Sequence, residues 1–163
     1  MNPTIAPPVS SALNPAPAEP LGANFHAHRL RRRPLRRELQ GSERIGPLSR
    51  ALIVAAAEAD AVLVSAISAW EISMLVVKDR LALDRDAGER LRAALRLPGL
   101  RLAALDPLVA VHSTRLPGDV RGDPADRLIV ATARHHAAVL ITDDRLILQY
   151  GAAGHVKAHR AAT

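Results

Sequence analysis

The chain has 163 residues and a mass of 17.4 kDa, and its composition of 48% hydrophobic but only 2% aromatic residues predicts one domain with an aliphatic core. It contains no cysteine, which excludes disulfide scaffolds and thiolate zinc sites and fits the cytoplasmic location that we expect. The formal net charge is +6, but residues 1–50 hold 8 Arg against 3 Glu and also 8 of the 12 prolines. The basic character therefore belongs to the head of the chain, and the remainder is nearly neutral.

Residues 1–43 form this basic, Pro/Arg-rich head, which we expect to be disordered or atypical. Six prolines in the first twenty residues exclude a helix or a central strand there. The arginine cluster RLRRRPLRR at 29–37 is typical of a solvated tail, with contact to nucleic acid or an anionic membrane as the alternative. The apolar run that follows, 51–57, is too short for an export signal or a membrane span, so we expect no membrane association.

From about residue 46 the sequence alternates between helix-like and strand-like segments. We expect helices at 47–58, 69–78, 86–97, from 106 onward and at 123–136, and strands at 61–65, 100–105 and 139–142. This alternation predicts an α/β domain with a parallel sheet, spanning residues 44–150 and followed by a tail at 151–163. In such sheets, functional sites form at the carboxyl ends of the strands.

Glu71 is the first acidic residue that does not fit a solvated surface. It lies on the same helical face as the apolar residues Ile67, Met74 and Leu75, where a carboxylate is costly unless it has a partner. Two structural interpretations stay open: a capping box formed by Ser68 and Glu71, and an ion pair with Lys78.

Asp126 lies on the apolar stripe of the helix that begins near Asp123, while Arg127, Ala131 and Arg134 are expected on its outer face. Asp123 is typical of a helix N-cap, and an acid at the third helical position also suits the helix dipole. Both acids therefore have a structural interpretation beside a functional one.

Asp143 and Asp144 follow the strand 139–142 directly, where aspartate is also common in ordinary turns. Thr142 either orients a carboxylate or only ends the strand. The pair His135-His136 has no metal-binding spacing and is interpreted as structural, because a cation is favoured at the end of a helix.

Glu71, Asp126 and Asp144 together are more informative than each alone, because a parallel sheet would gather them at one end. Clustered carboxylates repel each other, and Mg²⁺ or Mn²⁺, which prefer oxygen ligands, would compensate this repulsion. Such a site suits the hydrolysis of phosphodiester bonds.

Three segments in this order resemble the PIN-domain nucleases, and in particular the VapC-type toxins of toxin–antitoxin pairs: VLVSAISAWEISMLVVKDRLAL, LPGDVRGDPADRLIVATARHH and VLITDDRLI. The resemblance implies a three-layer fold with a parallel sheet between helices. It also implies RNA cleavage with Mg²⁺ or Mn²⁺ held by Glu71, Asp126 and Asp144. Asp123, Thr142 and Asp143 would be accessory residues, and the partners would be RNA, a cognate antitoxin and a second copy of the chain.

The sequence departs from this family at its front, where the family has a central apolar strand that ends in an aspartate. No such strand is evident before residue 46, so we expect the first central strand to be missing or replaced and the isolated chain to be marginally stable or to aggregate. The nearest equivalent is the segment 21–27, in which Asn24 would replace the acid as a weaker ligand. The alternative to an active ribonuclease is therefore a non-catalytic PIN-like protein that binds an antitoxin or RNA.

Overall fold

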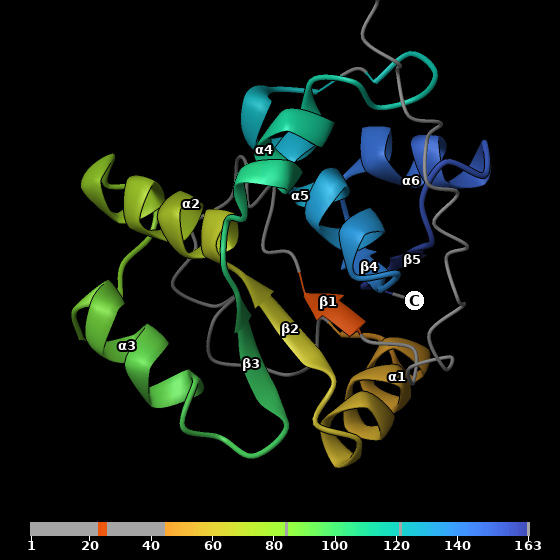
Figure 1. Cartoon of the computed structure of the whole chain (residues 1–163). Helices are drawn as coiled ribbons and strands as arrows, with labels where there is room; N and C mark the ends of the chain where they lie inside the picture. Colours follow the sequence, from red (N-terminus) through yellow and green to blue (C-terminus); the bar gives the residue numbers. More distant parts are fainter. Residues whose placement is uncertain (1–22, 26–44, 84, 121, 163) are drawn as a thin grey trace, which may run out of the picture.

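The computed structural model describes residues 23–25, 45–83, 85–120 and 122–162 (Figure 1). Its centre is a sheet of five parallel strands in the order β3-β2-β1-β4-β5. The strands are β1 (Ala23–Phe25), β2 (Val62–Ser65), β3 (Leu100–Ala103), β4 (Val139–Thr142) and β5 (Ala158–Arg160). The helices are α1 (Pro47–Glu58), α2 (Ala66–Val77), α3 (Ala87–Ala94), α4 (Pro107–Ser113), α5 (Pro124–His135) and α6 (Arg145–Ala152). The predicted α/β class with a parallel sheet is confirmed.

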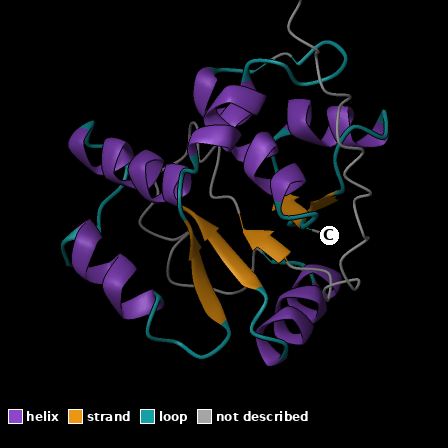
Figure 2. Cartoon of the chain, in the orientation of Figure 1, coloured by secondary structure: helices purple, strands orange, loops and turns teal. Residues whose placement is uncertain are grey.

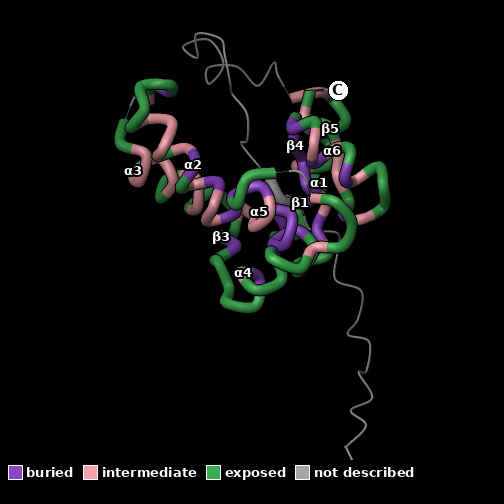
Figure 3. Tube along the Cα trace, turned by 90° about the horizontal axis from the view of Figure 1, so that it is seen from above, coloured by how far each residue is buried: buried purple, intermediate pink, exposed green. Residues whose placement is uncertain are grey.

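Two apolar clusters, one on each face of the sheet, make the domain three layers thick (Figure 2). The larger cluster joins α5, α6 and β4, and its buried members are Ile129, Val130, Ala133, Leu140, Ile147, Tyr150 and Val156. The smaller cluster packs α1 against β2 and β4 through Ala56, Ala61, Val62 and Ile141. Burial is therefore concentrated around β4 and α5, whereas α3 contains no buried residue (Figure 3).

Short polar residues fix where most of the helices begin. Asp86, Asp106, Asp123 and Asp144 are the N-caps of α3, α4, α5 and α6, and each carboxylate accepts at least one backbone N–H bond from the first turn. Gly99 is the last residue of the turn before β3 and has a φ of +82°, and a Cβ there would lie 2.2 Å from the carbonyl oxygen of Ala57. A glycine is thus required where α1 and β3 approach each other.

Helix α2 begins three residues earlier than the sequence predicts. Ser65, the last residue of β2, is the N-cap, and its hydroxyl accepts a 3.2 Å hydrogen bond from the backbone N–H of Ile67. Ser68 is therefore inside the helix, and the predicted capping box between Ser68 and Glu71 is wrong. Ala131 is a second correction: it is only 2% exposed, because α4 packs against the face of α5 that was expected to be solvated.

The expectation of a missing central strand is corrected, because β1 occupies that position. Asn24 is in register with Leu63 on one side and Leu140 on the other. The segment 23–25 belongs to the weaker alternative that the sequence offered, and it was not evident because it is short and lacks a regular apolar pattern. The rest of the head, residues 1–22 and 26–43, lies outside the described part of the chain.

The C-terminal tail predicted at 151–163 also contributes to the sheet. Strand β5 pairs with β4, with Leu140 opposite Ala158 and Thr142 opposite Arg160. The turn before β5 is buried through Val156. The domain therefore extends at least to residue 160. None of the described helices is long and apolar enough to cross a membrane.

Candidate functional site

Glu71, Asp126 and Asp144 are all buried near the carboxyl ends of the central strands. Asp144 follows β4, Glu71 lies in the second turn of the helix that follows β2, and Asp126 lies in the first turn of α5. The exposed fraction is 9% for Glu71, 5% for Asp126 and 0% for Asp144. Figure 1 shows α2, α4 and α5 gathered beyond the arrowheads of β2 and β3. Buried carboxylates are rare without a compensating function or partner, so this end of the sheet is the candidate site.

The Asp126 carboxylate is held by a reciprocal capping box. Its Oδ2 accepts a 3.1 Å hydrogen bond from the backbone N–H of Asp123, and Asp123 Oδ1 accepts a 3.0 Å bond from the backbone N–H of Asp126. Gly122 lies directly beneath this carboxylate, since a Cβ at position 122 would be 2.8 Å from Asp126 Cβ and 2.9 Å from its Oδ2. Asp123 is therefore structural in its contacts, as its N-cap interpretation predicted, and it also orients Asp126.

Asp144 is fixed from both sides of the β4–α6 turn. Its Oδ1 accepts hydrogen bonds of 2.8 Å from the N–H of Leu146 and 3.0 Å from the N–H of Ile147. The hydroxyl of Thr142, which is fully buried, accepts a 3.0 Å bond from the N–H of Asp144. One oxygen of Asp144 thus caps the helix, while the other, Oδ2, is buried without taking part in the cap.

Glu71 reaches the same region because α2 packs against α5. Ile67, one turn before Glu71, packs against the cluster that contains Ile129 and Val130, and these two follow Asp126 by one turn of α5. Residues four apart share a helix face. Glu71 therefore lies on the face of α2 that carries Ile67, and Asp126 lies on the face of α5 that carries Val130, and these two faces pack against each other in the core.

The donor set at this site consists of carboxylate oxygens, as Mg²⁺ and Mn²⁺ prefer. Glu71, Asp126 and Asp144 each make further polar interactions besides the hydrogen bonds above. Within the described residues, no three His, Cys, Asp or Glu side chains are close enough to share one metal ion. A magnesium-type ion is often bound by only one or two carboxylates and keeps several water ligands, so a site for it here would need fewer than three of these acids.

The remaining predicted site residues, Asp143 and Asn24, lie in the turn between β4 and α6 and in β1, respectively. Asp143 is exposed, and its Oδ1 accepts a 3.1 Å bond from the N–H of Ala162 near the C-terminus. Asn24 lies in the central strand, but its register partner Leu140 is two residues before the end of β4. The structure thus places Asp143 in a tether for the C-terminal segment.

Comparison with known proteins identifies this arrangement, since residues 42–152 match the profile of the PIN domain. The chain belongs to the PIN-domain family. All three buried acids lie inside the matched residues, and the resemblance drawn from the three sequence segments is confirmed.

Two similar proteins place this PIN domain more closely. The chain is 38% identical over 98 residues to Ribonuclease VapC22 of Mycobacterium tuberculosis, a stretch that covers 60% of this chain and 74% of the relative. It also resembles the crystal structure of VapBC2 from Rickettsia felis bound to a DNA fragment from their promoter, with a TM-score of 0.51 and 16% identity. That match covers 69% of this chain and 83% of the solved chain, and it shows the PIN-like fold alone.

Arg127 is a residue of this PIN domain whose contacts the sequence did not indicate. Its Nε donates a 2.9 Å hydrogen bond to the carbonyl of Ser113, and its Nη1 donates a 3.5 Å bond to the carbonyl of Val120. The guanidinium therefore ties α5 to both ends of the segment that leads from α4 to Gly122. The adjacent sequence GDPADR showed only that Arg127 follows the acid, which is not enough to predict a contact with residues 7 and 14 positions away.

Proposed function

We propose that this chain is a VapC-type toxin ribonuclease, which hydrolyses phosphodiester bonds in RNA. The observation that carries the proposal is the burial of Glu71, Asp126 and Asp144 at one end of the sheet of a PIN domain. The similarity to Ribonuclease VapC22, at 38% identity over 98 residues, supports RNA as the substrate.

We propose that Mg²⁺ or Mn²⁺ would be held at this end of the sheet by one or two of the carboxylates Glu71, Asp126 and Asp144, with water completing the ligand set. When bound, such an ion offsets the negative charge of the phosphate and lowers the pKa of water, which supplies the nucleophile. The protein's own contribution is orientation. The capping box orients the Asp126 carboxylate, and two N–H bonds hold Oδ1 of Asp144 at the start of α6, so that its buried Oδ2 lies outside the cap. Fixed carboxylates reduce the reorganisation that the reaction requires.

RNA cleavage by the full chain, with and without Mg²⁺ or Mn²⁺, tests the proposal. Asp126→Asn keeps an oxygen for the bond from Asp123 but removes the charge, and we expect it to reduce cleavage at least about 100-fold. Asp106→Asn is the control, because the Asp106 carboxylate likewise accepts a backbone N–H bond at the start of a helix, as the N-cap of α4, but is exposed. Equal cleavage by the wild type and by Asp126→Asn would refute the assignment.

Asn24 decides between an active enzyme and a non-catalytic PIN-like protein. An amide keeps one oxygen but no charge, so it should hold a divalent cation less strongly than an aspartate. We expect Asn24→Asp to increase Mg²⁺ affinity, measured by calorimetry, and to increase cleavage if position 24 contributes to the site. If neither the wild type nor Asn24→Asp cleaves RNA, the chain is a binding protein and the ribonuclease proposal fails.

We further propose that the chain pairs with a cognate antitoxin protein and forms a homodimer. Helix α2 supports an apolar contact, since its sequence is apolar nearly all round and it exposes Trp70 (55%) and Val77 (76%). A second exposed apolar set, with three-residue spacing from β3 through the following connection into α4, offers a surface for another copy: Leu102, Leu105, Leu108 and Val111. Light scattering of the purified chain, alone and with a cognate antitoxin, would test both assemblies.

A further inference from the structure

We infer that two adjoining cavities around Arg134 form a second RNA-binding site, which holds the phosphate backbone outside the acidic centre. This inference rests on the proposed function in one respect, which is that the bound polyanion is RNA. The binding itself requires neither a metal ion nor cleavage.

The first cavity, of about 420 Å³, lies between the end of α4 and the second half of α5. Its cationic or ionisable lining residues are His112, Arg115, Arg134 and His135, and all four side chains are exposed at its rim. The other lining residues are Leu116, Pro117 and Ala131. Two guanidinium groups beside two imidazoles make this hollow a concentration of hydrogen-bond donors.

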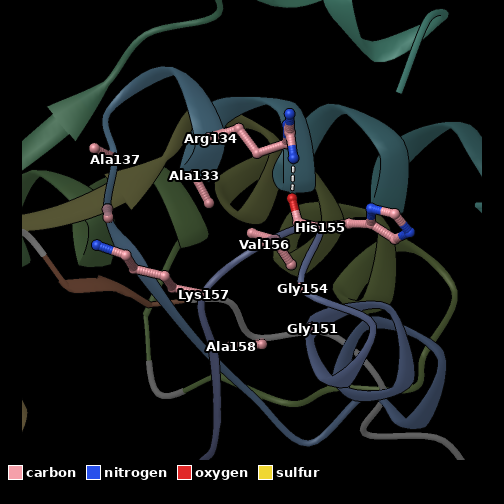
Figure 4. Close-up of a pocket in the computed structure, with 10 residues that line it drawn as sticks. Ala133, Arg134, Ala137, Gly151, Gly154, His155, Val156, Lys157 and Ala158 are labelled. Carbon is pink, nitrogen blue, oxygen red and sulfur yellow. Dashed lines mark hydrogen bonds between the residues drawn. The ribbon is translucent and has the colours of Figure 1, made fainter. Parts of the chain in front are cut away.

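The second cavity, of about 500 Å³, lies on the other side of Arg134, between the end of α5 and the start of β5. Figure 4 shows Arg134, His155 and Lys157 around it, among small residues that leave the space open. Arg134 lines both cavities, so they adjoin at its side chain, and we call the two together the basic track.

Among the residues that the structure describes, neither cavity is lined by an aspartate or a glutamate. Two titration shifts agree with a positive local potential. Partial burial lowers the pKa of His136, and the positive charges of His135 and Arg101 lower it further. Burial raises the pKa of Tyr150, whereas the nearby Arg134 and Arg127 oppose that increase. A phosphate chain is the ligand class that such a potential attracts.

The walls of the track are held in place by contacts between segments distant in sequence. Arg134 Nη1 donates a hydrogen bond to the carbonyl of His155 (Figure 4). The His155 ring lies against the ring of Tyr150, with centroids 4.7 Å apart, and the Tyr150 hydroxyl donates a 2.6 Å bond to the carbonyl of Pro117. Because these groups are already positioned, the track needs little reorganisation to accept a ligand.

The spacing from the acidic centre suits a single strand of nucleic acid. Arg134 follows Asp126 by eight residues on α5, which corresponds to about 12 Å along the helix axis. An RNA strand whose reacting phosphate lies near Asp126 therefore needs only a few nucleotides to reach Arg134. Among the described residues no Phe, Tyr or Trp lines either cavity, and the neighbouring Tyr150 is buried against His155, so the groups that face a ligand are mainly donors for phosphate. We therefore expect the track to hold phosphates without reading sequence.

Binding of a fluorescein-labelled 12-nucleotide oligouridylate tests the inference. The measurement uses Asp126→Asn protein in EDTA at 50–200 mM salt, so that neither cleavage nor divalent cations contribute. We expect Arg115→Gln/Arg134→Gln to weaken binding about 10-fold, and to reduce the slope of log K against log salt by about 1.4 for two lost phosphate contacts. Lys157→Gln should weaken binding less and reduce the slope by about 0.7.

Arg92→Gln/Arg96→Gln is the matched control, because it removes two exposed arginines from α3 and the turn after it. The inference is overturned if this control loses as much affinity as the double variant at Arg115 and Arg134. It is also overturned if neither Lys157→Gln nor the double variant changes the affinity or the salt slope, or if poly-glutamate binds the track and oligouridylate does not. RNA binding that depends on Arg134 in a chain without cleavage would separate this inference from the proposed ribonuclease function.

Discussion

Replacing Gly122 by alanine should impair catalysis far more than folding. The added Cβ would lie 2.8 Å from Asp126 Cβ and 2.9 Å from Asp126 Oδ2, both well inside van der Waals contact, so the Asp126 side chain must move. Moving it breaks the 3.1 Å hydrogen bond from the N–H of Asp123, which contributes about 1 kcal/mol. Because Gly122 does not have a positive φ, alanine fits its backbone and restricts the unfolded chain, which restores about 0.4–1 kcal/mol.

The free energy of unfolding should therefore fall by about 1 kcal/mol or less, as measured by urea denaturation. Cleavage of RNA should fall about 100-fold, since a displacement of about 1 Å in a catalytic group can have that effect. Gly88→Ala is the control: its Cβ would lie 3.0 Å from the N-cap carboxylate of Asp86 at the start of α3, in a similar turn remote from the acids. If Gly122→Ala remains folded and cleaves RNA as fast as Gly88→Ala does, the proposed positioning of Asp126 is wrong.

Four further predictions follow from individual contacts. Asp144→Asn should lose RNA cleavage but keep the α6 cap and most of the stability, because its amide oxygen can still accept from the N–H groups of Leu146 and Ile147. Asp144→Ala should lose cleavage and also lower the free energy of unfolding, measured by urea denaturation, by about 1 kcal/mol. Tyr150→Phe removes the 2.6 Å bond to the carbonyl of Pro117 and should lower stability by about 1 kcal/mol, seen as a melting temperature lower by roughly 3 °C. Because the pKa of His136 is lowered in the folded protein, this imidazole binds a proton more readily in the unfolded chain as the pH falls below about 6.5. The free energy of unfolding should therefore decrease from pH 7.5 to pH 5.0, as measured by urea denaturation. The decrease should be smaller in His136→Gln. Removal of residues 1–22 should leave β1 and cooperative unfolding intact, whereas removal of residues 1–44 should abolish the sharp thermal transition because β2 and β4 lose their common neighbour.

The sequence predicted most elements that have a strong local pattern. The strand at 139–142 and the helix at 47–58 have the predicted bounds, because an apolar run or an N-terminal proline marks them directly. Helix α2 was misplaced at its start because Ser65 and Ser68 are equally good caps in the sequence, and only the end of β2 decides between them. Strands β1 and β5 have three residues each, too few for a period of two to be visible, and they exist through pairing with β4.

The candidate site divides in the same way between local and non-local information. The sequence showed that Asp126 lies at the start of a helix, that Asp144 follows a strand and that Glu71 lies on an apolar helix face. The contacts that orient these acids were not, because Gly122 is important only where it meets the Asp126 carboxylate, and Arg127 acts on carbonyls 7 and 14 residues away. Sequence spacing thus indicates which groups carry the chemistry, whereas their orientation depends on tertiary contacts.

Both acids at helix starts combine a structural and a functional position in one side chain. Asp144 uses Oδ1 for the cap of α6 and Asp126 uses Oδ2 for the capping box, which leaves Oδ2 of the first and Oδ1 of the second buried outside these caps. A helix N-terminus stabilises a carboxylate through its N–H groups and dipole, so it lowers the cost of keeping an acid charged while buried. The structural interpretation of these aspartates as caps and the functional one as metal ligands are therefore compatible, because each interpretation needs a different oxygen. The two roles can be measured separately. An asparagine at either position preserves the capping oxygen, whereas an alanine removes it. If both oxygens are used, the asparagine variant should lose activity but keep its stability, and the alanine variant should lose both.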